Sequence, residues 1–568
     1  MLGGRREPQP VRAGTGRNGR GKGGRLKGRP LDDAALDDVR RLLGDAPRRR
    51  DLLIEHLHLL QDEFGGLTAA HLKALSHEMR LSEAEVFEVA SFYHHFDIVT
   101  DGAELPPLTI RVCDSLSCMM AGAEQLIAEL ETRADPREIR VVRAACQGRC
   151  SEAPAAQLGR NEIGNATADG LLAAAERHET SARPVEGLRL DGYRAKGGYA
   201  LLEACLADRH KPEDLIATLS DAGLRGLGGA GFPAGRKWDI VRSFAGPRLM
   251  TINGDEGEPG TFKDRIFLEQ DPHRMLEGAL IAAWAVGAER IYLYMRDEYP
   301  GVLEVLRQEL DALAATGLCD HAPIELRRGA GAYICGEESA MLESIEGKRG
   351  LPRHRPPYIA EKGLFGRPTL NHNIETLYWV RDILEHGAER FAGHGKDDHS
   401  GLRSFSVSGR VRNPGVAILP TGSTIHEIIE ACGGMADGHT LAGFLPGGAS
   451  GGIFPASMAD LPMDFGTFEP HGGFIGSHAV VILSDQDDMK AVALNLLRFF
   501  KHESCGQCTP CRTGTEKMVA MLERGDWDQD RLGDLEQVMR DASICGLGQA
   551  ASNPMRSVLK FFAQESAT

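Results

Sequence analysis

Three cysteines at intervals of three residues, Cys505, Cys508 and Cys511, have the clearest capacity for chemistry in this sequence. Thiolates at this spacing can hold three corners of a cubane iron–sulfur cluster, provided that a fourth ligand returns from elsewhere in the chain. Cys545 is the candidate for that fourth ligand. The run departs from the bacterial ferredoxin pattern, because Arg512 follows Cys511. Spacing alone also leaves open a structural zinc ion held by the same four cysteines.

A second set of four cysteines lies in two loops, each of which follows a predicted strand. The strands cover residues 108–112 and 139–142, and the cysteine pairs have spacings of C-x4-C and C-x3-C. Two such loops can meet at one end of a small sheet, where four thiolates suit a [2Fe–2S] cluster. Zinc is again the alternative, although zinc knuckles more often use a spacing of two. The four residues are Cys113, Cys118, Cys146 and Cys150.

The composition indicates a multidomain globular protein. Its 568 residues suffice for three or four domains, and 42% of them are hydrophobic and 26% charged. No run of 18 apolar residues occurs, so we expect no membrane-spanning helix and no membrane partner. No signal segment opens the chain, and twelve cysteines, eight of them in two sets, favour metal ligation over disulfides. We therefore predict a cytoplasmic location.

Positive charge is concentrated at the N-terminus. Residues 1–30 hold nine Lys or Arg and one acid, Glu7, whereas the whole chain has a net charge of −16. The acidic body argues against nucleic acid as a partner. The tail is rich in Gly and poor in apolar residues, so we predict that it is disordered and acts as a solubility or docking arm. An organellar targeting role stays open because the tail is rich in Arg.

The segment from Leu36 to Phe96 has the apolar spacing of helices. Leucines recur at helical intervals in residues 52–60, and Ser82 and Glu85 form a predicted capping box before a further helix. His94 and His95 are adjacent, so on a helix they point to different sides. We therefore predict a structural or solvent-facing role for both histidines.

A glycine-rich loop, Gly226–Gly231, matches the pattern G-x-G-x-x-G without its usual context. A dinucleotide fingerprint follows a strand, whereas residues 215–219 are predicted to be helical. The glycines still let backbone amides approach a phosphate or a flat ring, and Lys237 lies just beyond to neutralise an anion.

Two acidic loops follow predicted strands in the same region. Residues 248–252 lead into Asn253–Gly260, and residues 324–326 lead into Gly329–Ser339 with paired glutamates before a helix. Polar loops at the carboxyl ends of strands are where α/β sheets bind ligands. The stiff basic stretch Arg353–Tyr358 is placed to lie over a nucleotide.

The last third of the chain changes character. Residues 404–483 consist of short strands and turns with a short helix at 425–429, which suits a small β-grasp unit. Residues 487–501 form a predicted amphipathic helix that runs into Cys505, and the last sixty residues are predicted to be helical.

Four motifs occur in order: GLRGLGGAGFPAGRKW (223–238), NGDEGEPGTFKDR (253–265), YICGEE (333–338) and ESCGQCTPCRTG (503–514). Together they resemble the flavoprotein subunit of respiratory complex I, and the N-terminal four-cysteine region resembles the small [2Fe–2S] subunit of that complex. Such fusions occur in diaphorase subunits of NAD-reducing hydrogenases and in β subunits of NAD-linked Mo/W formate dehydrogenases. RFF-x-HESCGQCTPCR and MRDASICGLGQAASNP look most like the formate dehydrogenase β subunit.

The resemblance implies a multidomain α/β protein with a Rossmann-like flavin domain. The implied segments are a disordered basic tail at 1–30, a helical domain at 31–98, a thioredoxin-like [2Fe–2S] domain at 99–186, an FMN- and NAD-binding α/β domain at 187–402, a β-grasp (SLBB-like) domain at 403–486 and a helical bundle carrying [4Fe–4S] at 487–568.

The resemblance also implies which residues contact FMN and NAD. Flavin contacts would come from the loop with Lys237 and from polar residues on the strand ends. Phe232 would stack on the nucleotide, Glu258 would hydrogen-bond to it, and Glu338 would lie near the nicotinamide. His372 and Ile240 depart from the family, which usually has Asn and, in complex I, Phe at these positions. The full set is Gly226, Gly228, Gly229, Gly231, Phe232, Lys237, Asn253, Asp255, Glu256, Glu258, Tyr333, Gly336, Glu337, Glu338, Arg355, Tyr358 and Asn373.

The implied function is that of an NAD-linked oxidoreductase in which no side chain acts as nucleophile or base. Formate would be oxidised on a Mo/W-containing α subunit with iron–sulfur clusters. Electrons would pass through [4Fe–4S] to FMN and, as a hydride, to NAD+, with [2Fe–2S] beside the flavin. The alternatives are a diaphorase subunit of a NAD-reducing hydrogenase, a complex I-type NADH dehydrogenase module and, outside enzymes, a zinc-stabilised nucleotide-sensing module.

Overall fold

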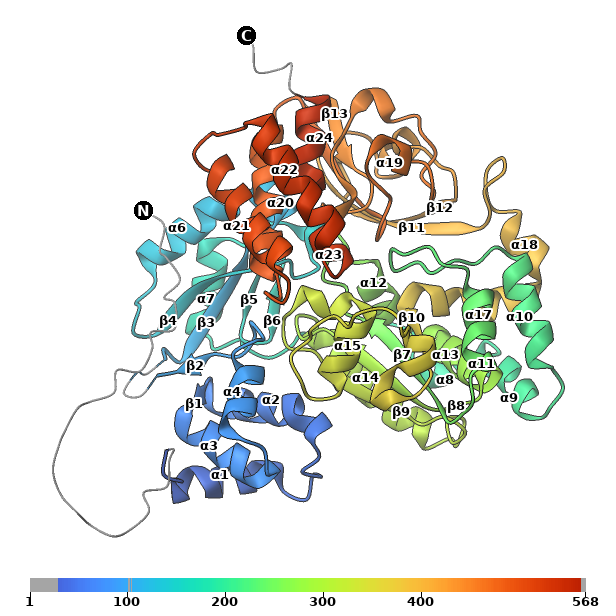
Figure 1. The fold of residues 1–568 in the computed structure, drawn as a ribbon, viewed down its shortest axis with the longest axis horizontal. Coiled ribbons are helices and arrows are strands. Elements are labelled where there is room, and N and C mark those ends of the chain that lie inside the picture. Colours follow the sequence, from blue (N-terminus) through green and yellow to red (C-terminus); the bar gives the residue numbers. More distant parts are fainter. Residues whose placement is uncertain (1–28, 101–102, 104, 563–568) are drawn as a thin grey trace.

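The computed structural model describes residues 29–100, 103 and 105–562. Residues 1–28, and with them nearly all of the predicted basic tail, lie outside the described residues. Figure 1 shows how the described parts are arranged: a helical N-terminal unit, two α/β units, a β-rich unit and a C-terminal helical bundle.

The N-terminal unit consists of four helices that share one core. They are α1 (Asp33–Leu43), α2 (Leu53–Phe64), α3 (Ala69–Met79) and α4 (Glu83–Ala90), with the short parallel pair β1 (Leu67–Thr68) and β2 (Ile98–Val99) beside them. The capping box predicted at Ser82 and Glu85 is confirmed at the start of α4. Buried leucines and valines line the facing sides of the helices, and their core continues into residues of the parallel-sheet unit described below, such as Ile334 and Leu342.

The next unit is a four-stranded mixed sheet of order β4-β3-β5-β6, covered by helices. Its strands are β3 (Leu108–Cys113), β4 (Ile139–Ala144), β5 (Ala156–Leu158) and β6 (Asn161–Ile163), and its helices are α5 (Leu116–Met120), α6 (Ala123–Arg133) and α7 (Ala168–Glu176). Strands β3 and β4 are parallel, with Cys113 opposite Ala144. Parallel pairing brings the loops after both strands to one end of the sheet, as the sequence predicted.

The largest unit is built on a fully parallel sheet of order β10-β7-β8-β9. Its strands are β7 (Arg248–Gly254), β8 (Ala288–Met295), β9 (Ile324–Arg328) and β10 (Thr369–Asn373). The apolar pattern of the sequence predicts the first three strands but not β10. The helices of this unit are α8 (Leu190–Ala195), α9 (Ala200–Leu206), α10 (Pro212–Asp221), α11 (Ala234–Ser243), α12 (Lys263–Gln270), α13 (Pro272–Val286), α14 (Pro300–Ala314), α15 (Glu338–Ile345), α16 (Ile359–Lys362), α17 (Ile374–His386) and α18 (Ala388–Ala392).

A five-stranded sheet of order β12-β11-β15-β13-β14 follows. Its strands are β11 (Leu402–Gly409), β12 (Gly415–Pro420), β13 (Leu441–Leu445), β14 (Phe454–Pro455) and β15 (Ala479–Ser484), with helix α19 (Ile425–Ala431) packed on them. The central strands β11 and β15 are parallel and their outer neighbours are antiparallel. This is the mixed sheet with one crossing helix that the β-grasp prediction required.

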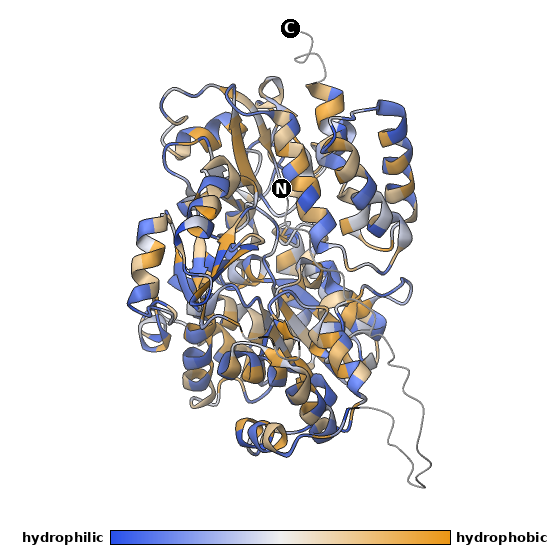
Figure 2. Ribbon diagram, turned by 90° about the vertical axis from the view of Figure 1, so that its left-hand side faces the viewer, coloured by the Kyte–Doolittle hydropathy of each residue, from blue (hydrophilic) through white to orange (hydrophobic). Residues whose placement is uncertain are grey.

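The C-terminal bundle comprises α20 (Met489–Glu503), α21 (Thr509–Leu522), α22 (Gln529–Ala542), α23 (Gly546–Ala550) and α24 (Asn553–Phe561). Figure 2 shows apolar residues concentrated on the strands and on the inner sides of helices, with hydrophilic residues outside. Among the described residues, no helix is both long and apolar enough to cross a bilayer.

Candidate functional site

Four thiols converge in the C-terminal bundle. Cys505 and Cys508 precede α21, Cys511 lies in its first turn, and Cys545 is the residue before α23. All four line one small cavity, whose other walls include the apolar residues Ile334 and Leu547. The N-terminal end of α21, which carries a partial positive charge, stabilises thiolates there. Four soft thiolates with no imidazole or carboxylate in the lining fit an iron–sulfur cluster.

The N-terminal thiols also converge, at the end of β3 and β4. Cys113, Cys118, Cys146 and Cys150 are all buried, and the Sγ atoms of Cys146 and Cys150 are 3.3 Å apart. Phe262, which belongs to the unit built on the parallel sheet, packs against this last pair. The two loops therefore form one four-thiol site, which faces a different domain of the chain.

A cavity of about 1000 Å³ opens at the carboxyl end of the parallel sheet. Its walls include the glycine-rich loop, the strap 352–358 and the residues around Cys545. This volume lies at the upper end of the range for ligand pockets, so two ring systems can be accommodated together. Cys545 lines both this cavity and the thiol cavity of the bundle, so the two sites adjoin.

The glycine-rich loop is held close to neighbouring chain segments. A Cβ at Gly228 would lie 2.9 Å from Cβ of Asn373, and a Cβ at Gly231, which has a φ of +64°, would lie 2.9 Å from the Phe465 ring. A side chain at Gly228 would push the loop away from the end of β10, and one at Gly231 would meet the Phe465 ring of the β-rich unit. Gly226 and Gly228 line the cavity, whereas Gly229 and Gly231 are not among its lining residues, so the predicted contacts of the latter two stay predictions.

The acidic loop after β7 has three carboxylates with different partners. Asp255 is buried, its Oδ2 has no hydrogen-bond partner, and burial raises its pKa well above the usual range. Glu256 accepts hydrogen bonds from the amides of Asp264 (2.8 Å) and Arg265 (3.1 Å) and from the hydroxyl of Tyr299 (2.9 Å). Neither Asp255 nor Glu256 is among the residues that line the cavity, so their predicted flavin contacts stay predictions.

Glu258 and Tyr333 connect the domains. Glu258 accepts from the hydroxyl of Tyr333 and from the amide and hydroxyl of Ser450, the latter at 2.8 and 2.7 Å. Asn253 donates to the carbonyl oxygen of Gly336 (2.8 Å). The predicted nucleotide contacts of these residues stay predictions, since their polar atoms already tie the loop to the β-grasp unit and to the 333–336 turn.

Charged side chains meet across the cavity. Glu337 caps the start of α15 by accepting from the amides of Ser339 and Ala340, and Arg355 pairs with both Glu337 and Glu338. Lys237 donates to the carbonyl oxygen of Asn371 (2.9 Å) and lies 3.7 Å from Glu338.

Two aromatic rings flank the cavity mouth. Phe232 and Tyr358 both line the cavity while remaining solvent-exposed, at 38% and 59% of their full surface. Exposed rings with one free face are suited to stacking on a planar ligand.

The base of the cavity holds the two residues that depart from the family pattern. Asn373, next to His372, donates to a carboxylate oxygen of Asp264 (2.6 Å). The indole Nε1–H of Trp238 donates to Nε2 of His372 at 2.7 Å. Because the indole can only donate, His372 is the neutral tautomer protonated at Nδ1. Burial and the nearby Lys237 lower the pKa of His372 well below 6.5. Ile240 lines the same cavity.

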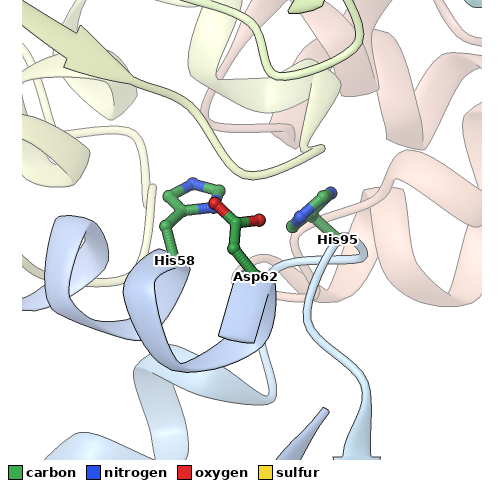
Figure 3. Close-up of side chains that lie close together, drawn as sticks. All are labelled: His58, Asp62 and His95. Carbon is green, nitrogen blue, oxygen red and sulfur yellow. The ribbon is translucent and has the colours of Figure 1, made fainter. Parts of the chain in front are cut away.

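The two adjacent histidines serve a domain junction. His95 pairs with Asp297 at 2.5 Å and His94 lies 3.6 Å from Glu503. Figure 3 shows His58 and Asp62 of α2 close to His95, and their candidate ligand atoms lie within 4.8 Å of one another.

The cation at that junction is an arginine. Arg328 donates to both oxygens of Asp62, at 2.5 and 3.1 Å, and also pairs with Asp297. We therefore interpret these side chains as an ion-pair network that joins the N-terminal helices to the parallel sheet β10-β7-β8-β9. No local pattern in the sequence identifies it, because members such as Asp62 and Arg328 are 266 positions apart.

Comparison with known proteins assigns the domains. The chain matches the family models for a thioredoxin-like [2Fe–2S] ferredoxin (residues 39–178), the Nuo51 FMN-binding domain (219–382), the SLBB domain (404–454) and the NADH-ubiquinone oxidoreductase-F iron–sulfur binding region (491–568). The expected fold class is confirmed, and so is the cofactor set of FMN, NAD, [2Fe–2S] and [4Fe–4S].

Two relatives match about two thirds of this chain, and a solved structure matches more of it. The chain is 40% identical to the F 2 subunit of NADH-quinone oxidoreductase of Rhizobium meliloti (strain 1021) over 396 residues, which are 67% of this chain and 94% of that protein. It is 40% identical to the F subunit of the same kind of enzyme of Aquifex aeolicus (strain VF5) over 390 residues, 66% of this chain and 90% of that protein. A chain of the crystal structure of an NAD+-reducing [NiFe]-hydrogenase in the H2-reduced state superposes with a TM-score of 0.81 and 32% identity, covering 91% of this chain and 93% of that chain.

Proposed function

This chain belongs to the family of NADH-quinone oxidoreductase F subunits, and from that premise we propose that it is the NAD-reducing subunit of a formate dehydrogenase complex. It would accept electrons released from formate on a Mo/W-containing partner subunit and deliver them to NAD+. The sequence details around Cys505 and Cys545 support formate as the source, since they look most like the formate dehydrogenase β subunit.

The observation that carries the redox role is the position of Cys545. Its thiol belongs to the four-thiol set of the bundle and also lines the large cavity, so a one-electron carrier held there would adjoin the proposed nucleotide site. Bound FMN supplies the exchange between single electrons and a hydride, which neither nicotinamide nor an iron–sulfur cluster can make alone.

The residues of this chain would bind and orient the two planar ligands. Backbone amides of the Gly226–Gly231 loop and Lys237 would meet anionic groups, and Asn253 and Asn373, which line the cavity, would contact the flavin. Phe232 and Tyr358 would stack on the nucleotide at the mouth, with Glu338 beside the nicotinamide. Such positioning is the main contribution of the protein to hydride transfer.

A hydrogenase is the second candidate source of electrons. The likeness to a chain of the NAD+-reducing [NiFe]-hydrogenase extends over 91% of this chain, including the N-terminal cysteine domain. A complex I-type module is favoured by the identity to the F subunits of NADH-quinone oxidoreductases. The zinc-stabilised sensing module has no comparable support, because three of the four domain matches are to FMN-binding or iron–sulfur domains.

The test is anaerobic purification of the chain with its natural partners. Mass spectrometry would identify the large subunit, and NAD+ reduction would be assayed with formate and with H2 on the same preparation. Formate-dependent reduction with a molybdopterin-type large subunit supports the proposal. NAD+ reduction with H2 alone would identify the chain as a hydrogenase subunit. Quinone-dependent NADH oxidation alone would identify it as a complex I subunit.

A further inference from the structure

Three consecutive residues after β8 lie where the FMN-binding domain, called the flavin-side domain below, meets the N-terminal domains. They are Arg296, Asp297 and Glu298, of which Asp297 pairs with His95 as described above. Arg296 is 3% exposed, and its guanidinium donates in three directions. Nη2 donates to the carbonyl oxygen of Cys146 (2.6 Å), Nη1 to that of Glu256, and Nε to the carboxylate of Glu298 (3.2 Å). One buried cation thus joins a thiol-bearing loop to the acidic loop of the cavity.

The same face of the flavin-side domain gives the thiol loop a further donor. Arg265 is also buried, and its Nε donates to the carbonyl oxygen of Gly148 at 3.1 Å. The loop 146–150 therefore receives hydrogen bonds from a domain whose residues lie more than 100 positions away in sequence.

These contacts have a predictable electrostatic effect on a cluster held there. Reduction adds one negative charge to a four-thiolate site that is already anionic, and nearby donors and cations stabilise the more negative state. The effect is strong because the thiols and Arg296 are buried, where charges are poorly screened.

Neighbouring charges modify the effect in known directions. Glu298 partly neutralises Arg296 from the more exposed side, with 24% of its side chain accessible. Arg265 is paired with Glu269 at 2.8 Å. Arg296 is therefore the cation whose removal changes the field at Cys146 most directly.

We propose that Arg296 is a positioning residue that raises the reduction potential of the binuclear centre and fixes its loop against the acidic loop of the cavity. The inference deepens the proposed function, because it concerns a cluster of that same electron-transfer chain. It assigns to a residue of the flavin-side domain the tuning of a centre whose ligands all lie in another domain.

The experiment is an EPR-monitored redox titration of the full-length chain under anaerobic conditions, with iron and sulfide content measured for each variant. In Arg296→Gln we expect the equilibrium constant for one-electron reduction of the binuclear centre to fall about tenfold. This fall equals a midpoint lower by about 59 mV. Arg296→Lys keeps the charge and should show a smaller shift. The [4Fe–4S] signal serves as an internal reference and should not move.

Two further variants separate tuning from structural damage. Glu298→Gln removes the neutralising carboxylate and should shift the binuclear midpoint upward, opposite to Arg296→Gln. Arg327→Gln is the matched control, because Arg327 is an equally buried arginine that contacts Asp51 and Glu55 and makes no contact with the thiol loop. It should leave the midpoint unchanged.

The outcomes distinguish this inference from the proposed function. An unshifted midpoint in Arg296→Gln or Glu298→Gln, or an equal shift in Arg327→Gln, would overturn the role of Arg296 while leaving the wild-type clusters intact. If Arg296→Gln fails to assemble the centre, the presence or absence of an upward shift of the binuclear midpoint in Glu298→Gln still tests the role of Arg296. A wild-type chain with no binuclear signal would overturn the proposed function itself. Neither formate nor NADH enters the titration.

Discussion

The indole Nε1–H of Trp238, on α11, donates a 2.7 Å hydrogen bond to Nε2 of His372, on β10, at the base of the ligand cavity. Both side chains are buried, and the bond fixes the ring of His372 and its tautomer. A pair of residues 134 positions apart thus sets the shape of the cavity floor.

Loss of the acceptor in this pair should destabilise the protein. In His372→Leu the buried indole donor of Trp238 has no partner, which costs about 1–3 kcal/mol. We expect Trp238→Phe in the same chain to recover part of that loss, because both partners are then apolar. Chemical unfolding of the two single variants and the double variant measures the coupling; additive effects would contradict the pairing.

Cys508→Ala should separate two activities of the chain. Removal of one thiol from the bundle site should abolish electron delivery from the partner subunit to NAD+. NADH oxidation by an artificial acceptor should remain largely intact, because the cavity residues are unchanged. Steady-state assays of both reactions on one preparation check this. Equal loss of both activities would contradict the assigned roles.

Arg355→Ala should weaken nucleotide binding more than turnover. Arg355 pairs with Glu337 and Glu338, and its removal leaves two carboxylates facing the cavity. Charge-assisted hydrogen bonds contribute about 1.5–3 kcal/mol, so we expect KM for NADH to rise about tenfold or more with a smaller change in kcat. Arg355→Lys is the control that keeps the charge. A fall in kcat at unchanged KM would argue against a binding role.

Acid should destabilise the chain through buried neutral histidines. Burial lowers the pKa of His58 well below 6.5, so the folded state keeps the ring neutral while the unfolded chain takes up a proton below about pH 6.5. The stability that this group contributes is complete above that pH and is lost progressively as the pH falls toward the lower, folded pKa.

His58→Gln should therefore make the pH dependence of stability shallower. Each such histidine contributes a slope of at most about 1.4 kcal/mol per pH unit in that window. Calorimetric unfolding at pH 7.5, 6.5 and 5.5 would measure it, with the exposed His77→Gln as the control. An equally steep decline in both variants would show that His58 does not carry the effect.

Local patterns in the sequence determined the elements and the thiol sets. Spacing of apolar residues located β7, β8 and β9 and the amphipathic helix α20, and the short intervals between Cys505, Cys508 and Cys511 identified their shared site. These predictions succeed because helix and strand periods, and the reach of neighbouring thiols, are fixed within a few residues. Strand β10 was missed because its polar residues lack that apolar signature.

Only the tertiary structure decided which of these elements meet. The contact of Arg296 with Cys146, the pair of His95 with Asp297 and the position of Cys545 on the cavity wall join residues far apart in the chain. Such contacts depend on how buried faces of separate domains pack, and packing leaves no periodic trace in the sequence. The amino-acid sequence, through its cysteine spacing and its family motifs, therefore predicted which cofactors the chain binds, while the packing of its domains decided how their sites are joined.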